Sequence, residues 1–559
     1  MASIAEQLAL HRYRHRSPGR KLIARPLAIP GWGIALTVLL PILSLAAIAS
    51  RGSGALWPHL VAYVLPQAAL ETSMLLAGTA AVVIGIGTGT AWLVAGFRFP
   101  GRSVLAWALL MPLAMPAYVV AYAYMDLLHP VGPVQSGLRA LLGVASPQDL
   151  RLPEFRSLGG AILLFGFVLY PYVYLNVRAN FLMQSAEVVE AARIFGSSGR
   201  RLFLHIALPL ARPAIVAGAA LALMETLGDL GACELLGVQS LTVSVYVTWV
   251  TRGSIEGAAQ IALAMLVPVA AVILMTYAPR SGRSYASASP QPLAARQLGP
   301  IAGILAAIAC AIPIVLGFVI PAVHLGILAV TRLAEHGVSP LLLSSAWNSA
   351  RFAATATVLA VAAGFVIAFC QRRTALAGPV RVTQIGYAVP GTVLAVGLLG
   401  LLSAADIGIG LIGIESLRGL LLAASGIGVI MAYLARFLAI PASGIEAGFA
   451  KLPHALDEAA QAAGAGAVSI ARQIHWPLLQ PAVRTAALLM FIECVKELPA
   501  TLLLRSLNTE TLATFLYAEA SRGVYEDGAI AALGMAGLGL LPIIVLSRSA
   551  SYRRSSLKP

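Results

Sequence analysis

Five charged residues interrupt two otherwise apolar stretches of the chain, and their types suit the handling of an ion. Glu225 and Asp229 lie in "LMETLGDLG", whereas Glu493, Lys496 and Glu497 lie in "FIECVKELPA". Carboxylate oxygens are the donors that hard cations prefer. If these stretches cross a membrane, their charges should face a bundle interior or water, because a charge at the bilayer centre costs about 2.5 to 3.5 kcal/mol. They could therefore line a solute path, or equally form a buried ion pair that fixes packing.

A second pattern occurs twice. "EAARIFGSSGRRLFLHIALPL" begins at Glu190, and "EAAQAAGAGAVSIARQIHWPL" begins at Glu458. In each copy the E-A-A run suits a short helix, a glycine permits a bend without a Cβ clash, and a proline opens the next helix. A bent pair of helices joined to a long helix would make a lever for a soluble partner. The alternative is an ordinary loop with a glycine C-cap, and two copies in register favour the lever.

The composition indicates the class of protein that carries these residues. Of 559 residues 59% are hydrophobic and only 11% are charged, against about 25% charged in a soluble domain. The chain is therefore an integral membrane protein. Its net charge of +15 is not gathered into an aromatic-lined patch, so we expect no nucleic-acid partner. The four cysteines show no C-x-x-C spacing and have no histidine cluster beside them, so we expect no metal site.

Twelve apolar runs approach the roughly 20 residues that a transmembrane helix needs. They lie near 27–50, 70–94, 103–127, 158–178, 211–230, 258–278, 300–322, 348–370, 381–404, 418–440, 481–504 and 529–547. Prolines within these runs, Pro112, Pro116 and Pro390, predict kinks. Tyrosines in "PAYVVAYAYMD" and "YPYVY" could be gate residues, but anchoring at the membrane interface is the favoured interpretation. The sequence predicts an all-α polytopic membrane protein with about twelve spans.

The two halves of the chain are repeats. A shift of 268 residues carries Glu190 to Glu458, Gly196 to Gly464 and Pro209 to Pro477, and it carries Glu225 to Glu493 and Asp229 to Glu497. With three residues inserted, Tyr246 matches Tyr517. Each half has an even number of spans, so both must lie the same way up, as parallel six-helix repeats about an axis along the membrane normal. This arrangement predicts a central pathway on that axis.

The predicted organisation has five parts. They are a basic N-terminal segment 1–26, a first repeat 27–278 with the loop 184–210, a linker 279–299, a second repeat 300–548 with the loop 452–478, and a basic tail 549–559. The linker stands out because "APRSGRSYASASPQPLAARQLGP" is rich in Ser, Pro, Ala and Arg. Most basic residues fall in alternate loops, which predicts that both termini, the linker and the two E-A-A loops are cytoplasmic.

The E-A-A pattern resembles the EAA motif of the permease subunits of ATP-binding-cassette importers. Two fused halves, with "KELPATLLLR" after the second loop, look most like the ferric-iron importer group, and thiamine and phosphonate importers share this architecture. The second copy departs from the motif at Trp476, where leucine is usual. The resemblance implies a type I importer permease fold and assigns ATPase coupling to Glu190, Ala191, Ala192, Gly196, Ile206, Pro209, Glu458, Ala459, Ala460, Gly464, Ile474 and Pro477.

The resemblance also implies the partners and the location. Two copies of an ATPase subunit would bind on the cytoplasmic side, a solute-binding protein would dock on the periplasmic side, and the chain would lie in the lipid bilayer of a bacterial inner membrane. ATP and Mg would be held by the ATPase, and this chain would need no cofactor. The solute expected is ferric iron, with thiamine, phosphonate or polyamine as alternatives.

Two other classes of function remain for comparison. A secondary transporter would account for twelve spans but would not need two matched levers. A membrane enzyme would need a catalytic constellation, and the chain presents none, so we expect no enzymatic activity. The four lysines, Lys21, Lys451, Lys496 and Lys558, do not follow glycine, which excludes a Walker A motif. ATP hydrolysis is therefore expected in a separate subunit.

Overall fold

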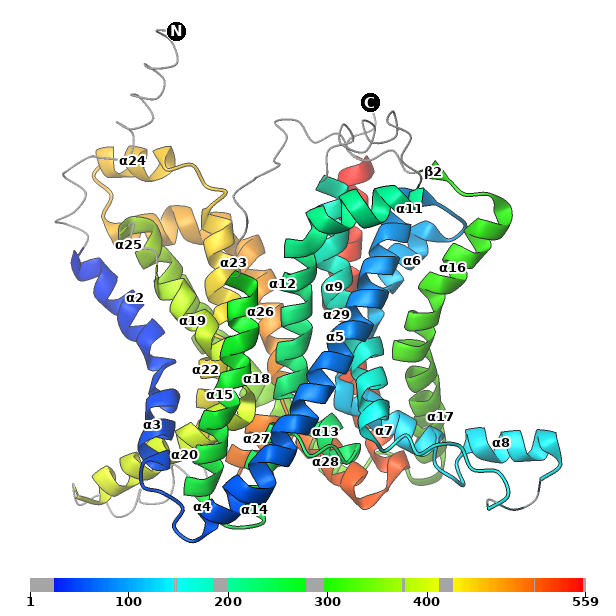
Figure 1. Ribbon diagram of the computed structural model, residues 1–559. Coiled ribbons are helices and arrows are strands. Elements are labelled where there is room, and N and C mark those ends of the chain that lie inside the picture. Colours follow the sequence, from blue (N-terminus) through cyan, green and yellow to red (C-terminus); the bar gives the residue numbers. More distant parts are fainter. Residues whose placement is uncertain are drawn as a thin grey trace.

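The computed structural model describes residues 25–144, 146, 148–183, 199–277, 296–374, 378–411, 426–506 and 508–555, and this part of the chain is almost entirely helical (Figure 1). Within these residues, nine helices are long and apolar enough to cross a membrane, and up to twelve spans result if each of three bent pairs counts as one. Helices suit this setting because their backbone groups are satisfied within the segment. The predicted fold class is confirmed.

Six span-forming segments make up the described part of the first repeat. In chain order they are α2 (Arg25–Thr37) with α3 (Leu40–Ala49); α4 (Leu56–His59), η2 (Leu60–Val64) and α5 (Leu65–Gly96); α6 (Arg102–Ala108), η3 (Met111–Ala114) and α7 (Ala117–Leu127); α9 (Leu158–Met183); α11 (Gly199–Leu202), η4 (Phe203–Ala207) and α12 (Leu208–Gly228); and α15 (Ile255–Tyr277). Shorter helices lie between them: α8 (Pro133–Leu142), α13 (Gly231–Leu235) and α14 (Leu241–Val250).

The described part of the second repeat has the same plan. Its segments are α16 (Pro300–Ile314), η5 (Val315–Val319) and α17 (Ile320–His336); α18 (Pro340–Thr374); α19 (Pro379–Ala388) with α20 (Gly391–Leu411); α22 (Ile427–Phe437) with α23 (Ala439–Phe449); α25 (Ala467–Ile470), η7 (Ala471–His475) and α26 (Trp476–Lys496); and α29 (Tyr525–Ser555). Its shorter helices are α24 (Ala455–Ala462), α27 (Pro499–Leu504) and α28 (Leu512–Arg522).

The borders of equivalent elements coincide between the two halves. A shift of 268 residues carries the π-helical turn η4 onto η7, the whole of α12 onto α26, and the first residue of α13 onto that of α27. Both long helices have a proline at their second residue, Pro209 and Pro477, directly after the π-helical turn η4 or η7. The duplication read from the sequence is therefore also a duplication of the fold.

The first span of each half packs against the other half. Helix α2 packs on α18 and α3 on α20, while α16 contacts α5 and α6. The approach of α3 to α20 is close: a Cβ atom on Gly397 would lie 2.1 Å from the carbonyl oxygen of Pro41. Only glycine fits at such a distance. This exchange of first spans interlocks the repeats, so the halves meet along a shared core.

The third predicted span, 103–127, is broken. Its two parts are inclined by 89°, and the break falls at Met115, whose backbone is extended (φ −106°, ψ 122°) before Pro116. In the second half Val389 is likewise extended before Pro390 and separates α19 from α20. The residue before a proline is disfavoured in the helical region, so the kinks predicted at Pro116 and Pro390 are confirmed, and Pro112 lies in the 3-10 turn that leads into the first break.

A short parallel pairing joins the two halves near the linker. Strand β1 (Phe97–Arg98) pairs with β2 (Arg296–Gln297), with Phe97 opposite Arg296. The pairing ties the end of the predicted linker 279–299 to the loop after α5. Residues 279–295 of that linker, most of the basic N-terminal segment 1–26 and the last four residues of the tail lie outside the described residues.

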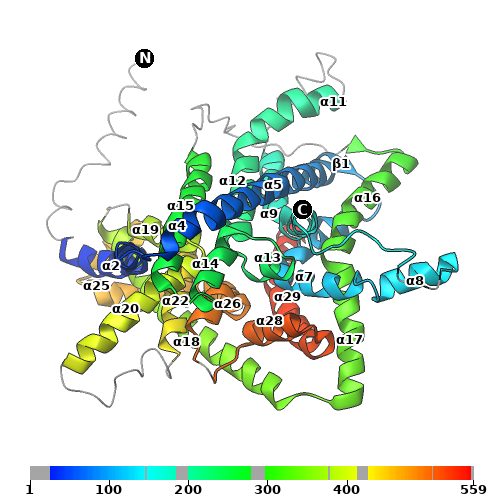
Figure 2. The same ribbon diagram turned by 60° about the horizontal axis from the view of Figure 1, so that its bottom comes forward.

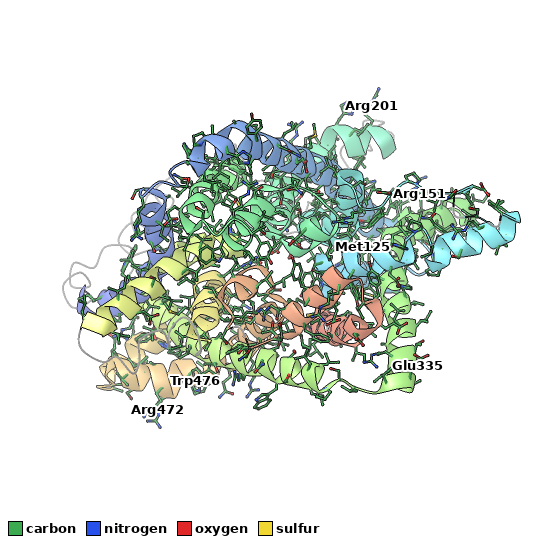
Figure 3. All side chains as sticks on the ribbon, turned by 90° about the horizontal axis from the view of Figure 1, so that it is seen from below. Met125, Arg151, Arg201, Glu335, Arg472 and Trp476 are labelled. Atoms are coloured by element: carbon green, nitrogen blue, oxygen red, sulfur yellow. The ribbon has the colours of Figure 1, made fainter. Side chains whose placement is uncertain are left out.

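The two ends of the molecule carry different elements. Helices α24 and α25 of the second half and α11 of the first lie at the same end of the molecule, whereas α13, α14 and α28 lie toward the other end (Figures 1 and 2). Seen along the spans, Arg201 on α11 and Arg472 beside α25 stand at opposite edges of the bundle (Figure 3). A parallel repeat about a central axis requires this arrangement, because it places equivalent elements at the same end but on opposite sides.

Candidate functional site

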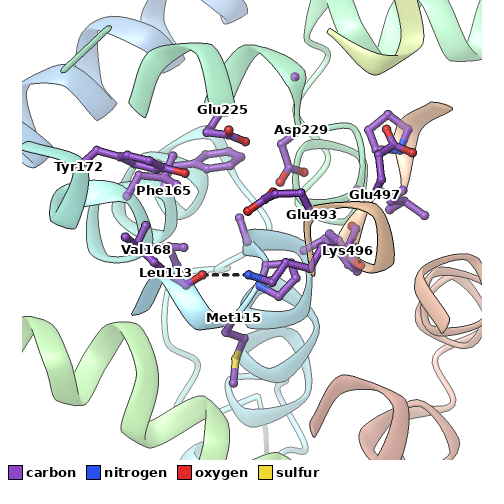
Figure 4. A pocket seen from close by; sticks show the side chains of 18 of the residues that line it. Leu113, Met115, Phe165, Val168, Tyr172, Glu225, Asp229, Glu493, Lys496 and Glu497 are labelled. Carbon is purple, nitrogen blue, oxygen red and sulfur yellow. Dashed lines mark hydrogen bonds between the residues drawn. The ribbon is translucent and has the colours of Figure 1, made fainter. Parts of the chain in front are cut away.

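A charged cavity lies where the two repeats meet (Figure 4). It encloses about 800 Å³ of space free of protein atoms, part of it open to the outside. The lining comes from η3, α7, α9, α12 and α13 of the first half and from α22, α26 and the start of α27 of the second.

All five residues proposed from the sequence as a solute path line this cavity: Glu225, Asp229, Glu493, Lys496 and Glu497. They come from the ends of the equivalent helices α12 and α26, which explains why residues 268 positions apart converge (Figure 4). Their convergence makes the prediction geometrically possible. Their role in transport stays a prediction, because a packing role requires the same proximity.

Glu497 has a clear structural task. Its Oε1 accepts hydrogen bonds from the backbone N–H of Ala500 at 3.0 Å and from Arg436 at 2.9 Å, and its Oε2 accepts from the N–H and the hydroxyl of Thr501 at 2.9 and 2.8 Å. The carboxylate thereby caps the first turn of α27, where unpaired backbone N–H groups need an acceptor. Glu497 is thus a wall element whose charge is already matched.

Asp229 occupies the equivalent position in the first half. Its Oδ1 accepts a hydrogen bond of 2.7 Å from the N–H of Ala232 in α13. Both carboxylates follow the last residue of a long helix, α12 or α26, at a point where the backbone becomes extended. The local reason is the same in each half: an acidic residue at the break satisfies the first turn of the short helix beyond it.

Fewer hydrogen bonds within the protein hold the other three side chains, those of Glu225, Glu493 and Lys496. The hydroxyl of Tyr387 donates to Glu225 Oε1 at 3.2 Å across the boundary between the halves. Lys496 Nζ donates to the carbonyl of Leu113 at 3.2 Å, also across that boundary (Figure 4). These three side chains are therefore the best candidates for direct contact with a solute.

Sequence reasoning missed two residues of this site, Arg436 and Tyr387. Arg436 lies in "MAYLARFLAI", and an arginine inside an apolar span was itself a signal of a buried role. The anchor interpretation of the tyrosines was wrong for several of them: Tyr118 and Tyr172 line the cavity, and Tyr122 is buried. Tyr118 also donates to the carbonyl of Lys496 at 3.3 Å. Among the described residues, no group of three His, Cys, Asp or Glu side chains could hold a metal ion.

The second E-A-A loop forms a bent pair of helices. Glu458, Ala459 and Ala460 lie in α24, Glu458 is exposed, and Gly464 follows with φ +81° before α25 begins. The N–H of Ala465 bonds the carbonyl of Ala460 at 2.9 Å, which closes the helix end through a left-handed glycine. The glycine is thus a C-cap and also the bend. Ile474 lies in η7 and Pro477 in α26, so the loop leads directly into a long span.

The first E-A-A loop is described only in part. Ile206 lies in η4 and Pro209 in the first turn of α12, in register with Ile474 and Pro477. Glu190, Ala191, Ala192 and Gly196 lie outside the described residues. The coupling role of all twelve motif residues stays a prediction.

A buried ion-pair cluster holds the second loop against the bundle. Asp457 accepts hydrogen bonds from Arg372 Nε at 2.8 Å and from His475 Nε2 at 2.5 Å. Arg372 also donates to the carbonyls of Phe449, Leu452 and Pro453. Burial alone would raise the pKa of the Asp457 carboxyl, but its bonds with Arg372 and His475 outweigh burial and hold that pKa below its ordinary value. The cluster joins α24 to α18 and to η7, which continues directly into α26, so motion of α24 reaches α26.

Replacing Gly464 by alanine is expected to destabilise the bend by about 1 to 2 kcal/mol, because a Cβ atom disfavours positive φ by this amount. Space is not the obstacle, since a Cβ there would meet nothing within 4 Å. Thermal unfolding of the purified protein measures the loss. Gly466, at φ −72° and equally open, is the control, and equal losses for G464A and G466A would contradict the role of φ.

Comparison with known proteins shows which transport proteins this chain resembles. Residues 81–279 match the family described as "Binding-protein-dependent transport system inner membrane component". The molybdenum transport system permease protein ModB of Escherichia coli K12 is 29% identical over 187 residues, covering 32% of this chain and 78% of that protein. The sulfate transport system permease protein CysT of Salmonella typhimurium is 28% identical over 200 residues, covering 36% and 69%.

One relative extends over both halves. The probable ABC transporter permease protein y4fN of Sinorhizobium fredii is 25% identical over 530 residues, covering 87% of this chain and 88% of that protein. The shorter relatives named above carry molybdenum or sulfate in their names, so the ferric-iron expectation gains no support from them. Residues 81–279 of this chain are therefore similar to the inner membrane components of binding-protein-dependent transport systems.

Proposed function

We propose that this chain supplies the complete transmembrane pathway of an importer and that two copies of a separate ATPase subunit drive it. The observation that carries the proposal is the paired geometry: two repeats meet around one charged cavity, and the elements of both E-A-A loops lie at one end of the bundle. A secondary transporter would not require two such loops. The ATP and Mg would be bound by the ATPase, not by this chain.

Helix α26 provides the mechanical link between energy source and cavity. It runs without interruption from Trp476, beside the second loop, to Lys496 in the cavity wall. Its 21 residues span about 31 Å at 1.5 Å per residue, which is close to the thickness of the hydrocarbon core. A displacement of α24 by the ATPase would therefore be delivered to Glu493 and Lys496, and the repeat assigns the same task to α12 and Glu225.

The direction of transport follows from the placement of partners. We place the ATPase at the end of α24 and α11, in the cytoplasm with both termini, and the solute-binding protein at the end of α13 and α28. ATP binding and docking of a loaded binding protein would favour the same outward-open state. Thermodynamic linkage then requires each of these events to strengthen the other.

For the solute, we propose a small inorganic oxyanion, such as molybdate or sulfate, on the strength of the relatives' names. Lys496 would be the contact, since its ammonium uses one bond on the Leu113 carbonyl and Arg436 is committed to Glu497. A second candidate is a cation such as ferric iron. It is favoured by a specific observation: four carboxylates, Glu225, Asp229, Glu493 and Glu497, face two cations, Lys496 and Arg436, which gives a formal charge of −2.

Uptake by a strain deleted for this chain tests the proposal. Radiolabelled molybdate, sulfate and ferric iron are supplied separately, and the deletion is complemented by the wild-type chain. We expect molybdate or sulfate uptake to fall at least tenfold on deletion and to return on complementation. Loss of iron uptake alone would show that the cation, and not an oxyanion, is the solute. Unchanged uptake of all three would reject both solute proposals. If the complementing chain also failed to copurify with an ATPase subunit, the importer role would be rejected.

A further inference from the structure

Two tyrosines that the repeat makes equivalent meet at the end opposite the E-A-A loops. Tyr246 lies in α14 of the first half and Tyr517 in α28 of the second. The Tyr517 hydroxyl donates a hydrogen bond to the Glu234 carboxylate on α13, and it also interacts with the Tyr246 hydroxyl. Tyr517 is 7% exposed. The hydrogen bond between Tyr517 and Glu234 therefore joins the two repeats.

Glu234 stands on an element that also forms the cavity wall. Helix α13 has only five residues, and Gly231 at its start lines the cavity. A Cβ on Gly231 would lie 2.6 Å from Leu498 and 2.8 Å from Tyr118, so α13 is packed tightly against its neighbours. Glu234 lies one turn further along the same short helix, so the Tyr517 bond holds an element that also forms the wall of the cavity.

The arrangement places one carboxylate beside two symmetric tyrosines, of which Tyr517 donates to it. The 268-residue shift places Leu502 where the first half has Glu234, so the repeat duplicates the tyrosines but not the carboxylate. A bond that only fixed packing within each half would be expected in both halves. A single carboxylate reached from the opposite repeat suits a contact that is made and broken as the halves separate.

We propose that Tyr517, Glu234 and Tyr246 form an outer latch that closes the cavity on the side of the solute-binding protein. The latch rests on the proposed importer function. In the resting state it would keep solute from entering without the binding protein, and docking of that protein would separate α28 from α13. Tyr517 and Glu234 are positioning residues in this proposal, because they act on access to the cavity and do not bind the solute.

Labelling of a cysteine in the cavity from outside tests the latch. The reporter is Ala117→Cys, at a small residue of the lining, and the reagent is a membrane-impermeant maleimide added to sealed right-side-out vesicles containing the chain alone. The four native cysteines are buried, and a chain without the reporter measures their background. Tyr517→Phe and Glu234→Ala each remove one side of a charge-assisted hydrogen bond, and we expect each to raise the labelling rate about tenfold.

The controls separate a latch from general loosening. Glu234→Gln retains an oxygen acceptor and should label near the wild-type rate, while Tyr63→Phe changes an exposed tyrosine and should have no effect. Tyr517→Phe combined with Glu234→Ala should label no faster than either alone. Labelling of Tyr517→Phe and Glu234→Ala at the rate of Tyr63→Phe would overturn the latch. The assay needs no solute, so failure of the importer proposal would show separately, in the uptake and copurification experiments.

Discussion

Replacing Asp457 by alanine is expected to cause the largest loss of stability among single changes in the second E-A-A loop. The Arg372 side chain is only 5% exposed and depends on this carboxylate. Removing one partner of a buried ion pair costs about 3 to 5 kcal/mol, and we expect the lower part of that range because Arg372 keeps three carbonyl acceptors. Thermal unfolding of the purified protein measures the loss, and solute uptake should fall with it.

The neighbouring residue provides the matched control. Glu458 is exposed in the same helix, so Glu458→Ala should change the free energy of unfolding by no more than about 0.5 kcal/mol. If Glu458 contacts the ATPase, as the motif implies, this variant should still insert and remain stable while uptake falls. Equal stability of D457A and E458A would refute the ion-pair cluster, and normal uptake by E458A would refute the coupling role.

The stability difference between the wild type and D457A should depend on pH in a definite direction. Because the pKa of Asp457 is lower in the folded protein than in the unfolded chain, its contribution is present above the unfolded value, about 3.9. That contribution is lost as the pH falls through the lower folded pKa. The difference in unfolding midpoint should therefore narrow below about pH 4, and a difference that widened there would contradict the assignment.

Replacing Lys496 by methionine is expected to lower oxyanion uptake at least tenfold. The change removes the cavity cation that is not paired with Glu497, and a unit charge 4 Å away contributes about 4 kcal/mol at an effective dielectric constant of 20. Uptake of labelled molybdate or sulfate by the complemented strain measures the effect. Methionine retains most of the side-chain volume, so packing in α26 is preserved.

The double change Glu225→Gln with Glu493→Gln tests the effect of the negative charges in the same cavity. It removes two negative charges while keeping the acceptor for Tyr387, and it should maintain or raise oxyanion uptake. Iron uptake that falls with this pair and survives K496M would identify a cation as the solute. The control is Glu335→Gln, at an exposed side chain that lies at the edge of the bundle (Figure 3). If none of these changes altered uptake, the cavity charges would serve packing and not transport.

Much of the architecture was predictable because its signals are local. Apolar runs of about 20 residues define spans, and Pro116 and Pro390 force breaks through their own geometry. The 268-residue repeat could be read from matching letters alone and reappears in the borders of α12 and α26. The convergence of Glu225 with Glu493 followed from that repeat, since equivalent residues of parallel repeats must face a common axis.

The roles of individual charged residues could not be read in the same way. Glu497 and Glu493 lie four residues apart in one apolar stretch, yet Glu497 caps α27 whereas Glu493 faces the cavity. The difference arises because the backbone becomes extended at Glu497. The neighbouring residues in the sequence give no signal of that change. Asp457 drew no attention beside Glu458, because its partners Arg372 and His475 come from distant helices.

The sequence by itself determined the membrane class, the spans, the duplication and the pair of E-A-A loops, since each rests on composition or spacing along one segment. Only the tertiary structure decided which side chains meet: Arg436 with Glu497, Tyr387 with Glu225, and Tyr517 with Glu234. The physical reason is that the spans are apolar on most of their surface, so hydrophobicity does not specify which faces pack together. Close packing at small residues such as Gly397 sets those neighbours, and with them the chemistry of the cavity.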